Sequence, residues 1–527
     1  MNPNWSFPYA SQRMPVLARN VVSTSQPLAA QAGLEMLRRG GNAADAAIAA
    51  AIALTVVEPT SNGIGSDAFA ILWDGDRLHG LNASGRSPKA WTRERFAGLN
   101  SMPISGWDSV TVPGAVSAWV ALSTKFGRLP FADLFAPAIH YAREGYAVAP
   151  VTAAAWKAAM GRLNDFWEWR RVFCPKDHAP APGELVQLPD HALTLEEIAE
   201  TRGESFYRGP LARRIADAAR EGNGALSEDD LGEHEAQWVK PISVDYRGHT
   251  IHEIPPNGQG IATLMALGCL EHLDMTSYLP DTPDCLHVQI EAMKLALSDA
   301  YAQVGDPDHM QVSVKQLLDA DRLSQRAHAI DLREAKLPKP ESFARGGTVL
   351  LCAADSEGMM VSFIQSNFWG FGSGIVVPST GIALQNRGYG FSLERGHPNE
   401  VGGGKLPFHT IIPGFITRGG EPLAAFGMMG GAMQAQGHTQ LVVRMIDQAQ
   451  NPQAAIDAPR WQVFEGRKVG VEAGVGQDVI TDLQRRGHLV EVMDPRQFGG
   501  AQVIWRMPNR HYCAASDPRK DGQAVGF

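Results

Sequence analysis

The sequence predicts an α+β protein in which helices lie outside sheets whose two faces are both buried. The segment from Ala46 to Val57 is almost entirely apolar, so a helix there must be covered on all sides and at least two layers must pack around it. Two apolar, β-rich runs at 348–355 and 359–365 are separated by a short glycine-containing turn at 356–358. Such a pair of runs predicts a hairpin, and its continuous apolarity predicts that neither face meets water.

The other elements are predicted from local patterns. Residues 24–39 have helical spacing, and Gly40-Gly41 supplies a left-handed stop. Asn42 or Asp45 can cap the apolar helix, which Glu58-Pro59 ends. Further strands are expected at 68–73, 78–82, 381–385, 489–493 and 502–505, and further helices at 115–126, 193–201, 260–270 and 286–304.

Composition argues against several classes of protein. The 527 residues include 47 Lys+Arg and 56 Asp+Glu, and the net charge of −9 argues against a nucleic-acid partner. Five scattered cysteines form no CxxC pair, which argues against a disulfide framework or a zinc site. The longest strongly apolar run is shorter than the ~20 residues of a membrane helix, and the first residues lack a signal-peptide pattern. We therefore expect a cytoplasmic protein with no membrane partner.

Two short motifs suggest cofactor or metal chemistry, and both have a simpler interpretation. Gly63-Ile-Gly65 begins a loose dinucleotide fingerprint, but here a helix precedes it and a strand follows, the reverse of the required order. A tight glycine turn is favoured. His249, His252 and Glu253 alternate in a strand-like stretch and match no zinc motif, so structural roles are favoured. We expect no metal and no organic cofactor.

The junction between Gly347 and Thr348 is more informative. Residues 334–347 contain two prolines, five charged residues and a terminal glycine pair, which is typical of an exposed connector, and a strand begins immediately afterwards. A threonine hydroxyl is a weak nucleophile that needs a base. If the bond before Thr348 were cut, the freed α-amine, with a reference pKa of ~7.7–8.0, would become that base within the same residue.

Motifs along most of the chain occur together in the order found in one known family. They include a long N-terminal stretch from Val21 to Pro59, Val112-Pro-Gly-Ala115, Ile254-Pro-Pro-Asn-Gly-Gln-Gly260, Gly305-Asp-Pro307, Gly372-Ser-Gly374, Gly430-Gly431, Asp457-Ala-Pro-Arg460 and Ser516-Asp-Pro-Arg519. With these motifs, the chain resembles the γ-glutamyltransferase family of N-terminal-nucleophile hydrolases from about Val21 to Arg519.

The resemblance implies a four-layer αββα sandwich that is made as an inactive precursor, a zymogen. The precursor would cut itself autocatalytically between Gly347 and Thr348, giving a large chain of residues 1–347 and a small chain of 348–527. The two chains would stay associated, and we expect a dimer of such heterodimers. Thr348 would attack an amide carbonyl, and the backbone N–H groups of Gly430 and Gly431 would hold the oxyanion. The resemblance implies no cofactor.

The sequence departs from the family pattern around the nucleophile. In the family, an Asp holds the α-amine of a γ-glutamyl donor, and Gly390 occupies its position here. A second threonine that supports the nucleophile is aligned with Gln365, while the catalytic Asn is retained as Asn367. This alignment places one gap between Thr348 and Gln365.

The family's carboxylate-binding groups also differ. The Ser-Ser pair is replaced by His409-Thr410, and the carboxylate-binding Arg is displaced by two positions to Arg86. Arg86 and Arg387 would leave the substrate pocket cationic, because no acid remains there to attract an ammonium group. We therefore assign Arg86, Gln365, Arg387, His409 and Thr410 to substrate binding.

These departures favour an amide hydrolase or acyl transferase that acts on a small carboxylate-bearing amide. A dicarboxylic monoamide or a 2-oxo acid amide such as oxamate fits a cationic pocket. The alternative within the family is a true γ-glutamyltransferase or glutathione hydrolase. The alternative of another class is a member that no longer catalyses and serves as a binding or scaffold protein.

Overall fold

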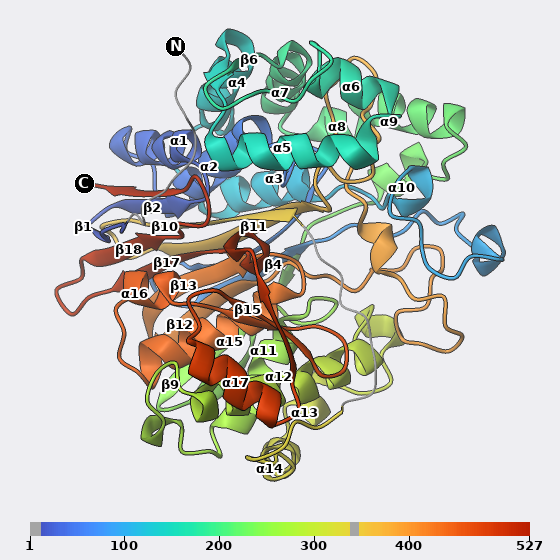
Figure 1. The fold of residues 1–527 in the computed structure, drawn as a ribbon. Coiled ribbons are helices and arrows are strands. Elements are labelled where there is room, and N and C mark those ends of the chain that lie inside the picture. Colours follow the sequence, from blue (N-terminus) through green and yellow to red (C-terminus); the bar gives the residue numbers. More distant parts are fainter. Residues whose placement is uncertain (1–11, 338–346) are drawn as a thin grey trace.

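The computed structural model describes residues 12–337 and 347–527. Two seven-stranded antiparallel sheets lie face to face, and helices cover the outer face of each sheet (Figure 1). The predicted four-layer αββα arrangement is confirmed. Each sheet contains strands from both sides of the Gly347–Thr348 bond, so the two predicted chains build the fold together.

The first sheet carries Thr348 on a central strand, in the order β19-β2-β10-β11-β3-β4-β7. The predicted hairpin is formed by β10 and β11, which are buried along almost their whole length. The strands are β2 (Val21–Thr24), β3 (Asp67–Trp73), β4 (Leu78–Ala83), β7 (Gln237–Val239), β10 (Gly347–Ala354), β11 (Met360–Phe368) and β19 (Gln523–Gly526).

The second sheet has the order β1-β18-β17-β13-β12-β9-β8, and its central strand β13 ends directly before the Gly430-Gly431 pair. The strands are β1 (Val16–Ala18), β8 (Ile242–Tyr246), β9 (His249–Glu253), β12 (Pro413–Arg418), β13 (Glu421–Met429), β17 (Gly500–Arg506) and β18 (Tyr512–Ser516).

The helices over the first sheet surround the apolar helix α2. Its Asn42 cap and Asp45 form a reciprocal capping box, and every residue of the helix is buried, as its composition requires. The helices of this layer are α1 (Pro27–Arg38), α2 (Ala43–Val57), α3 (Ala115–Phe126), α4 (Ala136–Glu144), α5 (Pro150–Leu163), α6 (Trp167–Phe173), α7 (Pro189–Thr201), α8 (Glu204–Arg208), α9 (Pro210–Glu221) and α10 (Glu228–Gly232). A strand pair also lies here, β5 (Tyr146–Ala147) with β6 (Leu185–Val186).

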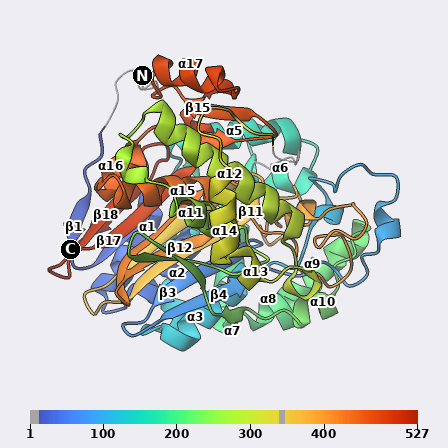
Figure 2. The same cartoon turned by 90° about the horizontal axis from the view of Figure 1, so that it is seen from below.

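The helices on the second sheet lie across its outer face, as the view from below shows (Figure 2). They are α11 (Gly260–Leu270), α12 (Pro283–Gln303), α13 (Val314–Leu317), α14 (Ala320–His328), α15 (Met433–Ile446), α16 (Pro452–Asp457) and α17 (Gln477–Arg485). A three-stranded sheet packs with them, formed by β14 (Trp461–Val463), β15 (Lys468–Glu472) and β16 (Leu489–Met493).

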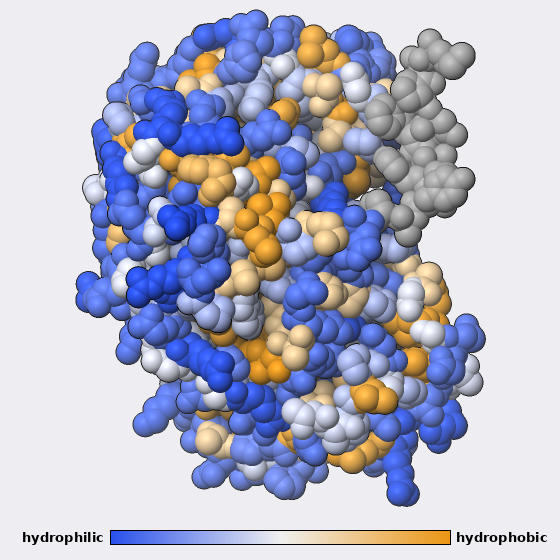
Figure 3. Space-filling view, turned by 90° about the vertical axis from the view of Figure 1, so that its left-hand side faces the viewer, coloured by the Kyte–Doolittle hydropathy of each residue, from blue (hydrophilic) through white to orange (hydrophobic). Residues whose placement is uncertain are grey.

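Three apolar clusters fill the spaces between the four layers. The adjacent residues Leu350 and Leu351 on β10 show the division: Leu351 packs with the helices around α2, and Leu350 packs between the two sheets. A third cluster joins the second sheet to α11, α12 and α15. Outside these layers, the face around β1 and the C-terminus is mostly hydrophilic, with hydrophobic residues gathered in a central band (Figure 3).

Some predictions differ from the structure or fall outside it. Residues 381–385 form isolated bridges, such as Val376 with Ala383, because they cross beside the sheet and do not extend it. Most of the predicted connector, residues 338–346, lies outside the described residues. Within the two described ranges, no helix is both long enough and apolar enough to cross a membrane. A cytoplasmic location stays a prediction.

Candidate active site

Thr348 lies at an irregularity in the pairing of β10 with β11. Gly347 pairs with Phe368, but Val349 pairs with Gln365, so the register shifts at Thr348. A bulge of this kind bends the strand and re-aims one side chain. The residue is 2% exposed, and it lines a cavity of about 150 Å³ together with Gly430.

The Thr348 hydroxyl contacts two polar side chains from different elements. Its Oγ1 donates to Ser366 Oγ at 3.2 Å, and Gln434 Nε2 on α15 donates to Oγ1 at 3.4 Å. Gln434 is oriented by the Ile412 N–H, which donates to its Oε1 at 3.0 Å. Ser366 Oγ in turn donates to the Gly347 carbonyl at 2.7 Å. Ser366 therefore contacts both the predicted nucleophile and the carbonyl of the bond predicted to be cut.

The Gly430-Gly431 pair forms the turn between β13 and α15. Both residues have positive φ, +124° and +62°, which only glycine adopts without strain. Hydrogen bonds among the described residues use both carbonyls, through the N–H groups of Met433 and Gln434, and leave both glycine N–H groups free. Gln259 Nε2 also donates to the Gly431 carbonyl at 2.9 Å. The turn thus has two backbone donors that are unbonded among the described residues, and Gly430 lines the cavity of Thr348, where an oxyanion hole is predicted.

Arg387 places a buried positive charge next to Ser366. The residue is fully buried on a 3₁₀ turn (Arg387–Gly390), and its guanidinium donates to Thr410 Oγ1 at 2.8 Å and to Ser366 Oγ at 3.3 Å. The Phe368 ring lies 4.2 Å beneath it. Both hydrogen-bond partners are hydroxyl groups, so no carboxylate is bonded to the cation, and Nε has no partner among the described residues. Burial lowers the pKa of Arg387 to about 9.

Asp67 and His409 form a buried hydrogen-bonded pair close to Arg387. His409 Nδ1 accepts from the Ile411 N–H at 3.3 Å, which leaves the hydrogen on Nε2 to be donated to Asp67 Oδ2 at 3.1 Å. Burial, with a contribution from Arg387, lowers the pKa of His409 well below its ordinary value, so the ring is neutral. Burial raises the pKa of Asp67 to about 7, and the Arg387 charge opposes this. His409 is therefore a neutral hydrogen-bond donor to Asp67 and does not add a second positive charge.

Two residues that the sequence assigned to substrate binding, Gln365 and Arg86, are bonded to other parts of the protein. Gln365 points into the helical layer, where its amide donates to Ala51 O and to Asn62 Oδ1. The predicted alignment placed a gap before β11, whereas the residue that bonds to Thr348 is Ser366, without a gap. Asn367 accepts from Ser66 Oγ at 2.8 Å, and its Nδ2 is buried without a partner among the described residues, so its catalytic role stays a prediction.

Arg86 also lies outside the cavity that contains Thr348. Its guanidinium donates to Asp306 Oδ2 at 3.0 Å and to the Gly404 carbonyl at 2.9 Å. It lines a different cavity, of about 270 Å³, whose lining does not include Thr348. Arg86 therefore does not line the cavity of Thr348, and Arg387 is the cation bonded to Ser366, the partner of the Thr348 hydroxyl.

Sequence reasoning missed Ser366, Gln434 and Asp67. An ungapped offset from Thr348 would have found Ser366, and an acid at the start of the apolar run 67–73 was a visible signal for a buried carboxylate. Gln434 had no such signal, because only the turn of α15 against β10 brings it to Thr348.

The described residues contain one histidine–carboxylate cluster with metal-like spacing, formed by His287, Glu291 and His488. His287 is bonded to the Asp331 carbonyl and to His488, and the Lys294 ammonium contacts both Glu291 and His488. Hydrogen bonds thus occupy all four ring nitrogens. Of the histidines considered from the sequence, His252 bonds to Thr417 Oγ1.

Comparison with known proteins identifies the family. The model of the gamma-glutamyltranspeptidase family matches residues 29–527. The chain belongs to this family. Membership, together with the αββα fold, makes the chain an amide-hydrolysing enzyme of the N-terminal-nucleophile type.

Relatives of this gamma-glutamyltranspeptidase-family chain carry several names. It is 35% identical to a glutathione hydrolase-like proenzyme of Bacillus subtilis, over 97% of this chain and 98% of the relative. It is 36% identical to an oxamate amidohydrolase proenzyme of Klebsiella pneumoniae, over 95% and 97%. The crystal structure of a cephalosporin acylase from Bacillus halodurans matches with a TM-score of 0.96 and 49% identity, covering 100% of this chain and 99% of that one.

Proposed function

We propose that this chain cuts itself between Gly347 and Thr348, and that the new N-terminal threonine then hydrolyses a carboxylate-bearing amide. In the first step Thr348 Oγ1 would attack the Gly347 carbonyl carbon, and the peptide C–N bond would break to leave an ester and a free α-amine. Water would then release residues 1–347. The names of the Bacillus and Klebsiella relatives, which are proenzymes, support this step.

The catalytic step uses the same atoms with a different carbonyl. The Thr348 α-amine would accept the hydroxyl proton and pass it to the leaving amine as the amide C–N bond breaks. Gly430 and Gly431 N–H groups would hold the oxyanion, and water would hydrolyse the acyl ester. If another amine replaces water in this last step, the acyl group is transferred to that amine.

The observation that carries the substrate class is the Arg387 guanidinium, which is buried beside Ser366 and Thr410 without a bonded carboxylate. A substrate carboxylate would pair with it in a site that excludes water, where such pairs are strong. Gly390 supplies no acid to pair with an α-ammonium group, so γ-glutamyl donors lose the group that would recognise their amine. A dicarboxylic monoamide or a 2-oxo acid amide such as oxamate fits this arrangement best.

Strand pairing supports continued association of the two chains after cleavage. Small-chain β10 pairs with large-chain β2, β11 pairs with β3, and β12 pairs with β9. Cutting one peptide bond leaves these ladders intact. Assembly of two heterodimers into a dimer stays a prediction from the resemblance, which light scattering would measure.

Two measurements test the proposal. A denaturing gel should show two bands, and N-terminal sequencing of the smaller one should begin at Thr348. The processed protein should then be assayed against oxamate, glutaryl amides and γ-glutamyl amides. A higher kcat/KM for glutathione than for every amide without the α-amine would favour the glutathione hydrolase alternative. An uncut protein without activity would favour the scaffold alternative.

A further inference from the structure

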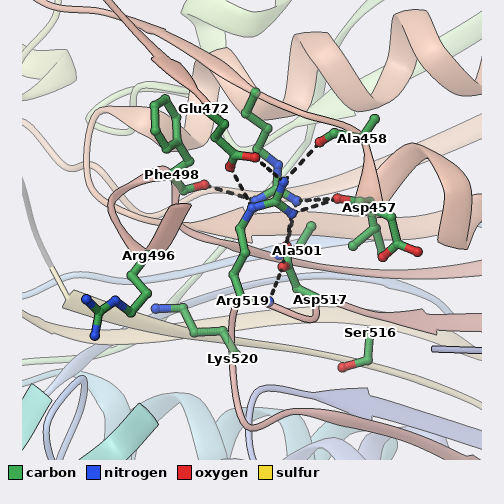
Figure 4. Close-up of polar contacts among 12 residues, drawn as sticks. Asp457, Ala458, Glu472, Arg496, Phe498, Ala501, Ser516, Asp517, Arg519 and Lys520 are labelled. Carbon is green, nitrogen blue, oxygen red and sulfur yellow. Dashed lines mark hydrogen bonds and ion pairs between the residues drawn. The ribbon is translucent and has the colours of Figure 1, made fainter. Parts of the chain in front are cut away.

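The cavity that contains Thr348 and Gly430 is also lined by two cationic residues that the proposed mechanism does not use. These are Arg496, in the loop after β16, and Lys520, after β18. Figure 4 shows the charged ends of both side chains in the same region, away from the neighbouring network around Arg519. Arg387 is bonded to Ser366 and is not part of this lining. Thr348 therefore has one cation bonded to its partner Ser366 and two others in the lining of its cavity.

The network around Arg519 pairs its own charges. Arg519 forms hydrogen bonds with both oxygens of Glu472, at 2.6 and 2.7 Å, and Arg460 donates to Asp517 at 2.5 Å. These side chains are buried, and their positive charges are matched by carboxylates within the cluster. The cluster fixes the end of β18 and leaves no carboxylate of its own bonded to the next residue, Lys520.

Lys520 is held in place by its surroundings at several points. Arg13 donates to its carbonyl at 2.8 Å, and the next residue, Asp521, accepts from the N–H groups of Val151 and Thr152 at the start of α5. A Cβ atom added to Gly500 would lie 2.6 Å from Lys520 Cγ, so the absence of a side chain at Gly500 makes room for the lysine stem. The stem is therefore packed against Gly500, the first residue of β17, in the lining of the cavity.

Among the described residues, no carboxylate pairs with the Lys520 ammonium. No hydrogen bond or ion pair joins its Nζ to any residue in the ranges 12–337 and 347–527. The acid whose charge it influences is Glu58, and that carboxyl is already bonded to Ser25 Oγ at 2.5 Å. Arg496 is bonded to Asp494 in its own loop, so it is partly neutralised, and it stays largely exposed.

An apolar groove shares one lining residue, Arg496, with this cavity. It has a volume of about 760 Å³, and its lining includes Val151, Ala154 and Met160 of α5 and the stretch 179–182. Arg496 lines both the groove and the nucleophile's cavity. The groove and the cavity therefore lie on either side of one cationic side chain, and Lys157 and His178 also line the groove.

We propose that Lys520 binds an anionic group on the amine half of the substrate, with the apolar body of that amine lying in the groove beside α5. This inference rests on the proposed function and refines it. The substrate class is an amide with a carboxylate on each side of the scissile bond: the acyl carboxylate meets Arg387, and the amine carboxylate meets Lys520. Cleavage breaks the amide C–N bond, forms the Thr348 ester, and releases the carboxylated amine with the proton from the Thr348 α-amine.

The test compares two substrates that differ in one charge, 4-(glutarylamino)benzoate and 4-(glutarylamino)benzamide. The processed wild-type enzyme should prefer the benzoate by about tenfold or more in kcat/KM, mostly through KM, as expected for a charge-assisted contact. Lys520→Gln should lower this preference to about twofold, and Lys520→Arg should retain most of it. Lys468→Gln, on an exposed lysine of β15, is the matched control and should keep the preference.

A binding measurement separates this inference from the proposed function. The released amines, 4-aminobenzoate and 4-aminobenzamide, are titrated into the processed enzyme by calorimetry, which needs no turnover. Tighter binding of the aminobenzoate in wild type, lost in Lys520→Gln, supports the subsite. If neither glutaryl amide is hydrolysed, the proposed acyl specificity is wrong, but this binding result still supports the subsite. Equal affinity for both amines, or an unchanged preference in Lys520→Gln, overturns the inference.

Discussion

Replacing Ser366 with Ala removes a hydroxyl that contacts both partners of the proposed self-cleavage. Ser366 Oγ donates to the Gly347 carbonyl at 2.7 Å and accepts from Thr348 Oγ1 at 3.2 Å. When Thr348 attacks, the Gly347 carbonyl oxygen gains negative charge, and the Ser366 hydroxyl is the donor already aimed at it. Arg387, 3.3 Å from the same hydroxyl, would strengthen this donor through its positive charge.

The expected slowing of self-cleavage can be estimated from the effect of removing a similar hydrogen-bond donor in other enzymes. Removing one donor from a developing oxyanion costs ~2.7–4 kcal/mol of barrier, so self-cleavage should slow by about 100- to 1,000-fold. Ser366→Thr keeps the hydroxyl and should restore most of the rate. The assay follows the disappearance of the precursor band on denaturing gels after purification of uncut protein.

Ser362→Ala is the matched control. Ser362 lies on the same strand, is equally buried, and donates to the Phe426 carbonyl at 2.8 Å. Both alanine variants should lose about 1 kcal/mol of stability from one buried hydrogen bond, but Ser362 does not contact the scissile bond. If Ser366→Ala cuts itself as fast as Ser362→Ala, the role assigned to the hydroxyl is refuted.

Three further predictions can be measured separately. Thr348→Ala should remain a single uncut chain without amidase activity, and two bands in this variant would place the cleavage elsewhere. Arg387→Met should lower kcat/KM for glutaryl amides by about 100-fold relative to valeryl amides, which lack the carboxylate, because one charge-assisted pair is lost; an unchanged ratio would remove Arg387 from substrate binding. Burial raises the pKa of Glu58 to about 7, so the folded state keeps a proton that the unfolded chain releases near pH 4–5, and stability falls as pH rises through about 7. Urea unfolding at pH 5 and pH 8 should show a smaller loss in Glu58→Gln, and an equal loss would mean that another group titrates.

Local sequence was sufficient for the helices and strands that carry their own signal. The helix α2 was predictable because every position is apolar or small, and such a helix can exist only under full cover. The β10–β11 hairpin was predictable because both runs are apolar and a short turn joins them. The small-residue context of Thr348 and the Gly430-Gly431 pair could be recognised for the same reason, since each is contiguous in the chain.

Residues facing Thr348 from β11 could not be assigned with certainty from the sequence. Neighbouring side chains on a strand point to opposite faces, so an error of one position exchanges Gln365, which points into the helical layer, for Ser366, which faces the nucleophile. The bulge at Thr348 makes this offset depend on backbone geometry that no residue type announces. The sequence also could not show which of Arg86 and Arg387 lies near Thr348, because both are many residues away from it along the chain.

The sequence by itself determined the layered fold and the family and indicated a candidate nucleophile, Thr348, because these depend on apolar pattern and contiguous motifs. The tertiary structure alone decided which charges surround that nucleophile. Arg387, Ser366, Gln434 and Lys520 come from four separate segments. Only the stacking of the two sheets and the docking of α15 bring them to Thr348, to its partner Ser366 or to its cavity. Electrostatic interactions act through space, so a pocket's charge cannot be read from the order of residues along the chain.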